Sequence, residues 1–298
     1  LAMLINSLNQ SYISAKRIEE VFAEEPEDIH SEIHVGKVSG HRVLQVSHLT
    51  FTYPDADLPV LSSINFTAEP GQTTAFIGST GSGKSTLINL IPRFYDVSAG
   101  QILLDGVDIR QLKLEDLYNQ IGYVPQKGVL FSGTIASNIK YGNAKASQKL
   151  VEKSAKIAQA AEFISELKNG YKNDIAQGGS NVSGGQRQRL SIARAIAVEP
   201  NVYIFDDSFS ALDFKTDAKL RSALAKETKH KTVLIVGQRI NTIMNADKII
   251  VLDEGKIVGQ GTHQELMKDC QVYQEIAASQ LSEDDLQKMS ATTAKGAA

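Results

Sequence analysis

The stretch TTAFIGSTGSGKSTLINL, residues 73–90, decides the fold class of this 298-residue chain. Its first six residues form a compact apolar run typical of a buried strand, and STLINL at its end has a helix-like spacing. Between them, Gly78–Thr86 reads GSTGSGKST and matches the pattern G-x-x-x-x-G-K-[ST], in the strand-to-helix context that gives this pattern its meaning. The stretch therefore predicts an α/β protein built around a phosphate-binding loop.

The chemistry of this loop indicates a nucleoside triphosphate as its ligand. Gly81 and Gly83 have no Cβ, so the backbone can curl around a phosphate, and the N–H groups at a helix N-terminus favour the anion. Lys84, a candidate catalytic residue, is expected to reach the β- and γ-phosphates, and the Ser85 hydroxyl to bind Mg²⁺. The residues predicted to contact the nucleotide here are Gly78, Ser79, Thr80, Gly81, Ser82, Gly83, Lys84, Ser85 and Thr86.

A second buried strand ends in two carboxylates. Residues 202–206, VYIFD, form an apolar run that delivers Asp206 at the C-terminal end of a strand, where ligands sit in open α/β sheets. We expect Asp206 to hold Mg²⁺ through water, and the adjacent Asp207 stands where a base that activates water belongs. A metal ligand beside a base predicts hydrolysis of the nucleotide.

A third motif, VSGGQRQR at residues 182–189, offers another place for phosphate. Ser183, Gly184 and Gly185 combine a hydroxyl with bare backbone N–H groups at the start of a predicted helix. Because the phosphate loop already cradles the phosphates of its own nucleotide, two such cradles in one chain indicate a site shared between two chains. The alternative interpretation is a capped helix with a glycine-rich start.

The rest of the chain alternates strand and helix signals, which favours a mostly parallel sheet with helical flanks. Residues 43–53 alternate as strands do, residues 147–170 are rich in helix formers and end in an Asn-Gly stop, and Glu254-Gly255 predicts a hairpin turn. The alternating segments are 186–200 and 215–230 for helices and 201–206 and 231–237 for strands.

Composition narrows the class of protein. The formal net charge of -3 gives no support for a nucleic-acid partner, which favours a basic stripe. The single cysteine, Cys270, rules out an internal disulfide and suggests a reducing compartment. No run of 18 or more apolar residues exists, and the first residues, LAMLINSLNQ, lack the basic region of a signal peptide. We expect the chain to be a fragment of a longer protein.

Together these motifs resemble the nucleotide-binding domain of an ATP-binding cassette (ABC) transporter of the exporter type, over about residues 42–280. The resemblance implies a P-loop NTPase (RecA-like) core with a mostly parallel sheet, an antiparallel β subdomain and a helical signature subdomain at about 127–195. It implies ATPase activity, with ATP and Mg²⁺ as the ligands.

The resemblance also assigns roles to further residues. Tyr53 falls where the family stacks an aromatic ring on adenine, and Gln126, in YVPQ, falls at the glutamine loop that contacts Mg²⁺. Gln186 completes the signature that begins at Ser183. Asp213 ends the SALD motif, which crosses the interface between two nucleotide-binding domains and contacts nucleotide.

Partners and location follow from the same resemblance. ISAKRIEEVF, residues 13–22, resembles the cytoplasmic end of the last transmembrane helix, so residues 1–41 are expected to be that end plus a linker at 26–41. FSGTIASNIKYG, residues 131–142, resembles the exporter stretch near the coupling helices. Residues 281–298 are expected to be a flexible C-terminal tail. The implied protein is a multidrug- or lipid-exporter half-transporter at the cytoplasmic face of the cell membrane. Its partners are its own transmembrane domain, the coupling helices of the partner and a second nucleotide-binding domain.

Three positions depart from the family pattern. The family usually has Glu where Asp207 stands, His where Gln238 stands in the switch loop, and Glu where Gln177 stands. Aspartate is one methylene shorter than glutamate, about 1.5 Å less in reach, and Gln238 offers a neutral amide without a transferable imidazolium proton. Since two of the three catalytic candidates, Asp207 and Gln238, are altered while the signature is intact, we predict a weakly hydrolytic site in one subunit of a heterodimer.

Other functions stay open at this point. A homodimeric exporter with slow turnover differs only in the partner, and a regulatory module would bind ATP without hydrolysing it. An ATPase of DNA maintenance or translation would share the signature. However, Ser85 and Ser183 lie only 98 positions apart (183 − 85), too few for a long coiled coil between them, and the chain carries one cassette.

Overall fold

A six-stranded sheet forms the centre of the protein, which the computed structural model describes over residues 2–23 and 43–280. From one edge to the other its strands are β12 (Lys256–Gly261), β11 (Lys248–Asp253), β3 (Thr73–Gly78), β10 (Thr232–Val236), β9 (Val202–Asp206) and β6 (Ile121–Val124). All neighbouring pairs are parallel except β11 and β12. Parallel strands are covered on both faces, which explains their near-continuous apolar runs. The mostly parallel sheet expected from the sequence is confirmed.

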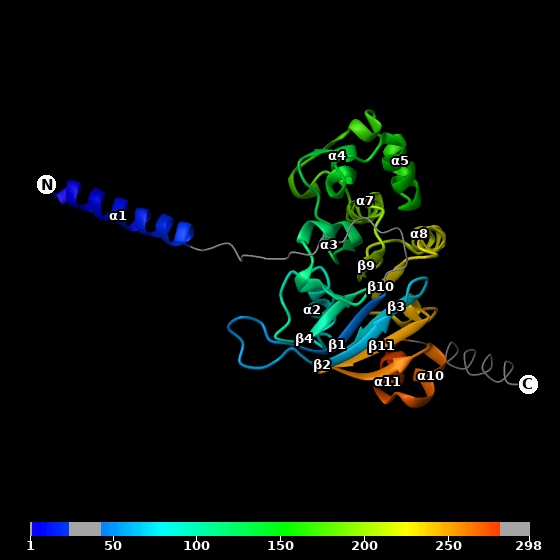
Figure 1. Ribbon diagram of the computed structural model, residues 1–298. Coiled ribbons are helices and arrows are strands. Elements are labelled where there is room, and N and C mark those ends of the chain that lie inside the picture. The colour runs from blue at the N-terminus through cyan, green and yellow to red at the C-terminus, as the bar shows by residue number, and fades with distance from the viewer. Residues whose placement is uncertain (1, 24–42, 281–298) are drawn as a thin grey trace, which may run out of the picture.

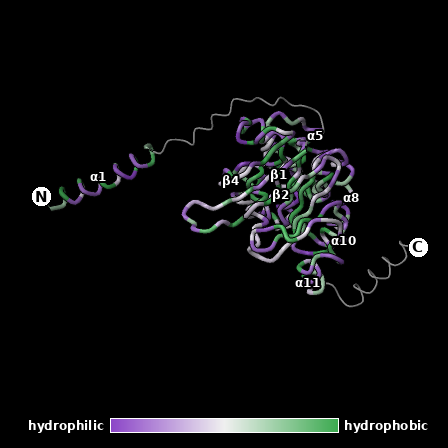
Figure 2. The backbone as a smooth tube through the Cα atoms, turned by 60° about the horizontal axis from the view of Figure 1, so that its bottom comes forward, coloured by the Kyte–Doolittle hydropathy of each residue, from purple (hydrophilic) through white to green (hydrophobic). Residues whose placement is uncertain are grey.

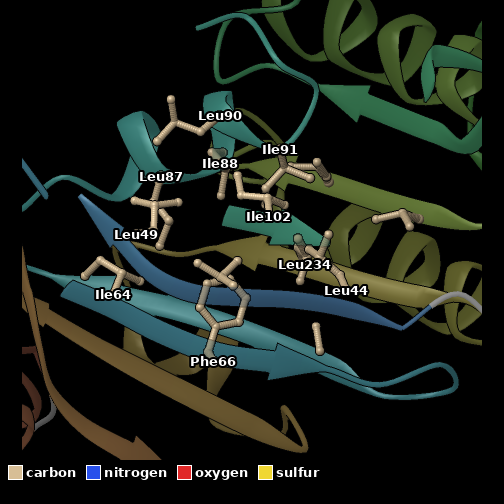
Figure 3. Close-up of a cluster of buried hydrophobic side chains, with 14 of the residues drawn as sticks. Leu44, Leu49, Ile64, Phe66, Leu87, Ile88, Leu90, Ile91, Ile102 and Leu234 are labelled. Carbon is tan, nitrogen blue, oxygen red and sulfur yellow. The ribbon is translucent and has the colours of Figure 1, made fainter. Parts of the chain in front are cut away.

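A second, antiparallel sheet packs against the helix that follows the phosphate loop, as expected for a β subdomain. Its strands, in order, are β2 (Leu61–Ala68), β1 (Leu44–Phe51), β4 (Ala99–Leu104) and β5 (Val107–Asp108). Leu87 and Ile88 of helix α2 (Lys84–Leu90) are fully buried in one cluster with residues of this sheet and with Leu234 of β10 (Figure 3). The helix that follows the phosphate loop is therefore fixed to both sheets. Helix α3 (Leu114–Gln120) closes the same cluster through Leu117.

A group of helices carries the signature and gathers at one end of the molecule (Figure 1). Its elements are α4 (Ile135–Ile139), α5 (Gln148–Ile157), α6 (Ala161–Glu166), α7 (Gly184–Ala197) and the short pair β7 (Gly133–Thr134) and β8 (Asp174–Ile175). Helix is confirmed within residues 147–170, but it is split between α5 and α6. Gln159 adopts a left-handed φ of 55°, and the flanking Ala158 and Ala160 are fully buried. Packing of these alanines outweighs the local helix propensity.

Helices from the last part of the described chain cover one face of the central sheet. They are α8 (Phe214–Glu227), α9 (Ile240–Ile243), α10 (His263–Asp269) and α11 (Gln271–Gln280), and the β11–β12 hairpin between α9 and α10 forms one edge of the sheet itself. The hairpin turns at Glu254-Gly255 as predicted, with φ of 43° and 73°, because a two-residue turn of this kind needs positive φ at both positions. Tyr273 and Ala277 of α11 are fully buried in a cluster with residues of β3 and β11.

Helix α1 (Ala2–Ala23) is exposed along its whole length, including Met3 at 90% and Phe22 at 85%. In Figure 2, hydrophobic residues otherwise concentrate in the strands at the interior of the molecule. Neither α1 nor any other helix within residues 2–23 and 43–280 combines the length and hydropathy needed to cross a bilayer. The predicted linker at 26–41 and the predicted tail at 281–298 lie outside the described residues.

Candidate nucleotide-binding site

Three adjacent strands of the central sheet end at one edge and bring the predicted site residues together. β3 leads into the phosphate loop, β9 ends in Asp206, and β10 leads into the switch loop, which we define as residues 237–240. Val236 of β10 pairs with Phe76 of β3 and with Asp206 of β9, so β9 and β10 end level and β3 continues two residues further, to Gly78. The carboxyl edge of a parallel sheet is where ligands bind in α/β proteins.

The backbone of the phosphate loop has the shape expected of an anion cradle. Gly81 and Gly83 have φ of 83° and 97°, which glycine adopts at little cost. A Cβ on Gly83 would lie 2.6 Å from Leu61 Cδ2, whereas one on Gly81 would meet nothing within 4 Å. Gly83 occupies the N-cap position of α2 and makes no side-chain cap hydrogen bond. The first N–H groups of α2 therefore have no capping side chain as an acceptor. The tip of the loop, Ser79, Thr80 and Gly81, is exposed.

Lys84 lies folded over this loop. Its Nζ donates hydrogen bonds to the carbonyl oxygens of Gly78 (2.9 Å) and Ser79 (2.6 Å) and to Ser82 Oγ (3.2 Å). Burial lowers the pKa of Lys84, while the nearby charges of Asp206 and Asp207 act in the opposite direction. The ammonium group is thus fixed beside the cradle, where a phosphate would exchange with the loop carbonyls as its partner.

Two of the three predicted protein ligands of Mg²⁺, Ser85 and Asp206, contact each other. Ser85 Oγ donates to Asp206 Oδ1 over 3.3 Å, and Asp206 is 6% exposed. Burial raises the pKa of Asp206, the hydrogen bond from Ser85 opposes this, and the neighbouring Asp207 adds to the rise. Mg²⁺ binds through one or two carboxylates plus substrate phosphates, so this pair fits it. A fuller cage is absent from the described part of the chain, which contains no cluster of three His, Cys, Asp or Glu suited to a metal.

Asp207 is held in an uncommon backbone conformation. Its φ is 43°, and its N–H donates to the carbonyl of Val236 over 3.0 Å. Gln126 Nε2 donates to Asp207 Oδ2 over 3.3 Å, which joins two predicted site residues 81 positions apart. Burial raises the pKa of Asp207, and the Gln126 hydrogen bond and the charge of Arg239 oppose this rise. Aspartate is one of the few residues that visit the left-handed region readily.

Gln238 lies in the switch loop, two positions beyond the end of β10, and is exposed. The preceding Gly237 donates its N–H to the carbonyl of Phe76 over 3.0 Å, so the switch loop begins beside the end of β3. The carbonyl of Gln238 accepts a hydrogen bond of 2.7 Å from Gln280 Nε2. The arrangement puts Gln238 and the carboxylates of β9 at the ends of adjacent strands.

The signature forms the start of α7 on a different element from the phosphate loop. Ser183 Oγ accepts from the N–H of Gln186 (3.2 Å), and Gln186 Oε1 accepts from the N–H of Ser183 (3.0 Å), a reciprocal capping box. The Ser183 hydroxyl can still donate its proton, and both Ser183 and Gly184 are exposed. A Cβ on Gly185 would lie 3.3 Å from the carbonyl of Ala211, so the signature adjoins the SALD segment.

Tyr53 and Asp213 each make a contact that the sequence did not suggest. Tyr53 Oη lies 3.0 Å from Thr86 Oγ1, which brings the aromatic ring to the phosphate-loop helix. The ring also packs edge-on against Tyr95, with centroids 5.3 Å apart. Asp213 caps α8, because its Oδ1 accepts from the N–H of Thr216 over 2.9 Å, and this bond lowers the pKa of Asp213.

Sequence reasoning missed two residues that act on the site. Arg239 places its charge near Asp207, and its position next to Gln238 was the only available signal. Gln280 bonds to the switch loop from 42 positions away, and no local pattern marks it. Contacts of this kind depend on how helices pack on the sheet.

Comparison with known proteins agrees with this geometry. The sequence profile of the ABC transporter family matches residues 61–210, half of the chain, and the chain belongs to this family. The protein is therefore an ABC-type ATP-binding domain, a class of domain that binds and hydrolyses ATP. The resemblance inferred from the motifs is confirmed, as are the P-loop fold class and its two kinds of sheet.

Individual relatives add detail. An uncharacterized ABC transporter ATP-binding protein of Mycobacterium tuberculosis is 50% identical over 241 residues, which is 80% of this chain and 41% of the relative. YfiB of Bacillus subtilis, another such protein, is 42% identical over 94% of this chain and 48% of its own length. A Staphylococcus aureus relative, named as a candidate multidrug export ATP-binding/permease protein, is 45% identical over 80% of this chain and 41% of its own length.

A solved structure shows the same fold. A bacterial Atm1-family ABC exporter with ATP bound matches with a TM-score of 0.83 and 33% identity, over 94% of this chain and 49% of that one. The chain thus spans less than half the length of the curated relatives described above.

Proposed function

We propose that this chain is the ATP-binding part of one subunit of a heterodimeric ABC exporter, with a weakly hydrolytic site of its own. One observation carries the proposal: Asp207 and Gln238, both departures from the family pattern, lie at the ends of adjacent strands beside the phosphate loop. Two altered groups in one chemical site weaken the same reaction, whereas the signature on α7 retains its full sequence.

The phosphate loop binds ATP through its backbone N–H groups, and Lys84 neutralises phosphate charge. Tyr53 supports the adenine ring, and Gln126 lies at the metal side of the site through its contact with Asp207. Ser85, Asp206 and Gln126 would hold Mg²⁺, which when bound neutralises the charge of the phosphates. The phosphate loop, Lys84, Ser85, Asp206 and Tyr53 all retain the residue types that nucleotide binding needs.

Hydrolysis at this site is weak for two geometric reasons. A base must come within about 2.6–3.2 Å of the water that it activates. The carboxylate of Asp207 is one methylene shorter than glutamate, and it is already tied to Gln126. Gln238 can hydrogen-bond to a γ-phosphate, but its amide carries no imidazolium proton. The site therefore holds ATP longer than it would with glutamate and histidine.

The signature serves the opposite nucleotide in a head-to-tail dimer. Ser183, Gly184 and Gly185 offer a hydroxyl and N–H groups at the exposed start of α7, and Gln186 fixes the shape of this start. Asp213 and the SALD segment adjoin the signature and would face the partner domain. This chain thereby completes a competent site whose phosphate loop belongs to the partner, and ATP-driven closure of the two domains turns the membrane helices outward.

In the full protein, a transmembrane domain would precede the described cassette, with α1 as its cytoplasmic end. The exposed apolar side chains of α1 support this assignment, as do relatives that are about twice as long as the chain. The cassette would then lie at the cytoplasmic face of the membrane and contact coupling helices near residues 131–142. We propose 42–280 as the limits of the cassette and 127–195 as its helical subdomain, and no nucleic acid as partner.

The test is to assay Mg²⁺-dependent ATP turnover by the chain alone and mixed with a partner domain that has Glu and His at the positions of Asp207 and Gln238. The chain alone should turn over slowly and the mixture briskly. Ser183→Arg in this chain should lower turnover of the mixture by at least about 10²-fold, whereas Asp207→Asn should leave most of it intact.

Two results would contradict the proposal. Brisk turnover by the chain alone, abolished by Asp207→Asn, would show that its own site is competent and would favour a homodimer. A mixture that is indifferent to Ser183→Arg would show that the signature does not complete the partner site.

A further inference from the structure

The switch loop, residues 237–240, is bound from outside the nucleotide site by the C-terminal helix of the described chain. Both ends of one amide take part. Gln280 Nε2 donates to the carbonyl of Gln238 over 2.7 Å, and Gln280 Oε1 accepts from the N–H of Ile240 over 2.9 Å. We infer that Gln280 is a positioning residue that sets the place of Gln238 in the site.

Helix α9 depends on this contact because it lacks a cap of its own. Arg239 is the residue before its first turn and makes no side-chain cap hydrogen bond. The N–H of Ile240, the first residue of α9, has no partner within the helix. Ile240 is 1% exposed, so an unmatched N–H there would be costly. Gln280 supplies the missing acceptor from another helix.

Helix α11 is a firm reference point for such a contact. Gln280 follows Tyr273 and Ala277 at the i, i+4, i+7 spacing that puts all three on one face of the helix. Tyr273 and Ala277 are fully buried and share a cluster with Ile240 and Ile243 of α9. Tyr273 Oη also lies 2.7 Å from His263 Nδ1 of α10. The amide of Gln280 is therefore delivered from a packed surface.

The switch loop is fastened on both sides of Gln238. On one side, the N–H of Gly237 is bonded to Phe76 of β3, and on the other the N–H of Ile240 is bonded to Gln280. Gln238 and Arg239 lie between these two points, and the carbonyl of Gln238 is itself bonded to Gln280. Since a misplacement of about 1 Å can cost on the order of 10²-fold in a reaction, loss of the second point should weaken contact with the γ-phosphate.

This inference rests on the proposed role of Gln238 at the γ-phosphate, and it predicts a difference between ATP and ADP. In Gln280→Ala the affinity for Mg²⁺-ATP should fall about fivefold to tenfold, the value of one or two hydrogen bonds. The affinity for Mg²⁺-ADP should stay near that of the parent chain, because ADP has no γ-phosphate. A purely structural defect would weaken both nucleotides alike.

The chain offers a matched control on the same helix. Gln274 Nε2 also donates to backbone carbonyls, those of Met267 (2.9 Å) and Lys268 (3.1 Å), but both of these belong to α10. Gln274→Ala removes a comparable amide and leaves the switch loop untouched. It should change neither the ratio of ATP to ADP affinity nor the hydrogen exchange of Ile240.

The experiment measures amide hydrogen exchange at Ile240 and both nucleotide affinities in the parent chain, Gln280→Ala and Gln274→Ala. The inference expects exchange at Ile240 to rise about fivefold to tenfold in Gln280→Ala only, together with the selective loss of ATP affinity. Unchanged exchange at Ile240, an unchanged ATP-to-ADP ratio, or equal effects of the two variants would each overturn it. None of these readouts needs a partner or turnover, so a failure of the heterodimer proposal would be seen separately in the mixing assay.

Discussion

Restoring the two altered groups should restore hydrolysis at the chain's own site. In Asp207→Glu with Gln238→His, the carboxylate gains one methylene, about 1.5 Å of reach, and the switch loop gains an imidazole. Positioning of this kind is worth on the order of 10²-fold in rate, which corresponds to about 2.7 kcal/mol of activation free energy. Turnover by the self-associated chain should rise by about that factor.

The backbone sets a cost on this change. Asp207 has a φ of 43°, a region that aspartate tolerates better than glutamate does. We expect Asp207→Glu to lower the free energy of unfolding by up to about 1 kcal/mol, a drop in Tm of roughly 2–4 °C for a domain of this size. Asp105 is also in the left-handed region, with a φ of 52°, so Asp105→Glu is a matched control for this backbone cost.

The assay follows Mg²⁺-ATP turnover over a series of protein concentrations, with Tm and ATP affinity measured on the same samples. Asp207→Glu alone and Asp105→Glu separate the effect of reach from the backbone cost, and Asp105→Glu should leave turnover unchanged. If the double variant folds, binds ATP and associates with itself, yet turnover does not rise, the geometric explanation of the weak site is wrong.

Three further predictions concern single residues. Tyr53→Ala should weaken ATP binding by about tenfold, since stacking of a base on an aromatic ring contributes about 1–3 kcal/mol; binding of inorganic triphosphate, which has no base, should not change, and an equal loss for both would refute stacking. Arg221→Met should destabilise the protein by about 1–2 kcal/mol in urea unfolding, because Arg221 donates to the carbonyl of Thr242 over 3.0 Å and lies over the ring of Phe209 at 4.3 Å; an unchanged midpoint would contradict this. Asp207→Asn should stabilise the nucleotide-free chain at neutral pH, because burial raises the pKa of Asp207 above its value in the unfolded chain. The parent chain therefore gains stability as pH falls from the folded-state pKa towards the unfolded-state pKa. The stability advantage of the variant should shrink over the same pH range. A pH series of Tm values measures this, and an advantage that does not vary with pH would refute it.

Local patterns were the predictable part of the site. The phosphate loop could be predicted because one apolar strand, glycines at defined offsets, a lysine and a hydroxyl all lie within the 14 residues 73–86. The signature was readable as a helix start because Ser183 and Gln186 stand three apart, as a capping box requires. The split of the helix at Gln159 was not readable, because burial of the two flanking alanines decides it.

The sequence by itself determined which chemical groups this protein possesses: a phosphate loop, a strand ending in two carboxylates, a signature, and Asp207 and Gln238 in place of the usual groups. These features lie within single segments, where spacing along the chain sets spacing in space. Only the tertiary structure decided which groups meet. Ser85 contacts Asp206 across 121 positions because β3 and β9 both lie beside β10, and Gln126 contacts Asp207 across 81 because β6 lies beside β9. Neither β3 and β10 nor β6 and β9 are consecutive strands in the chain. Gln280 contacts the switch loop because α11 packs on the same sheet, a contact set by buried surface and not by any local pattern.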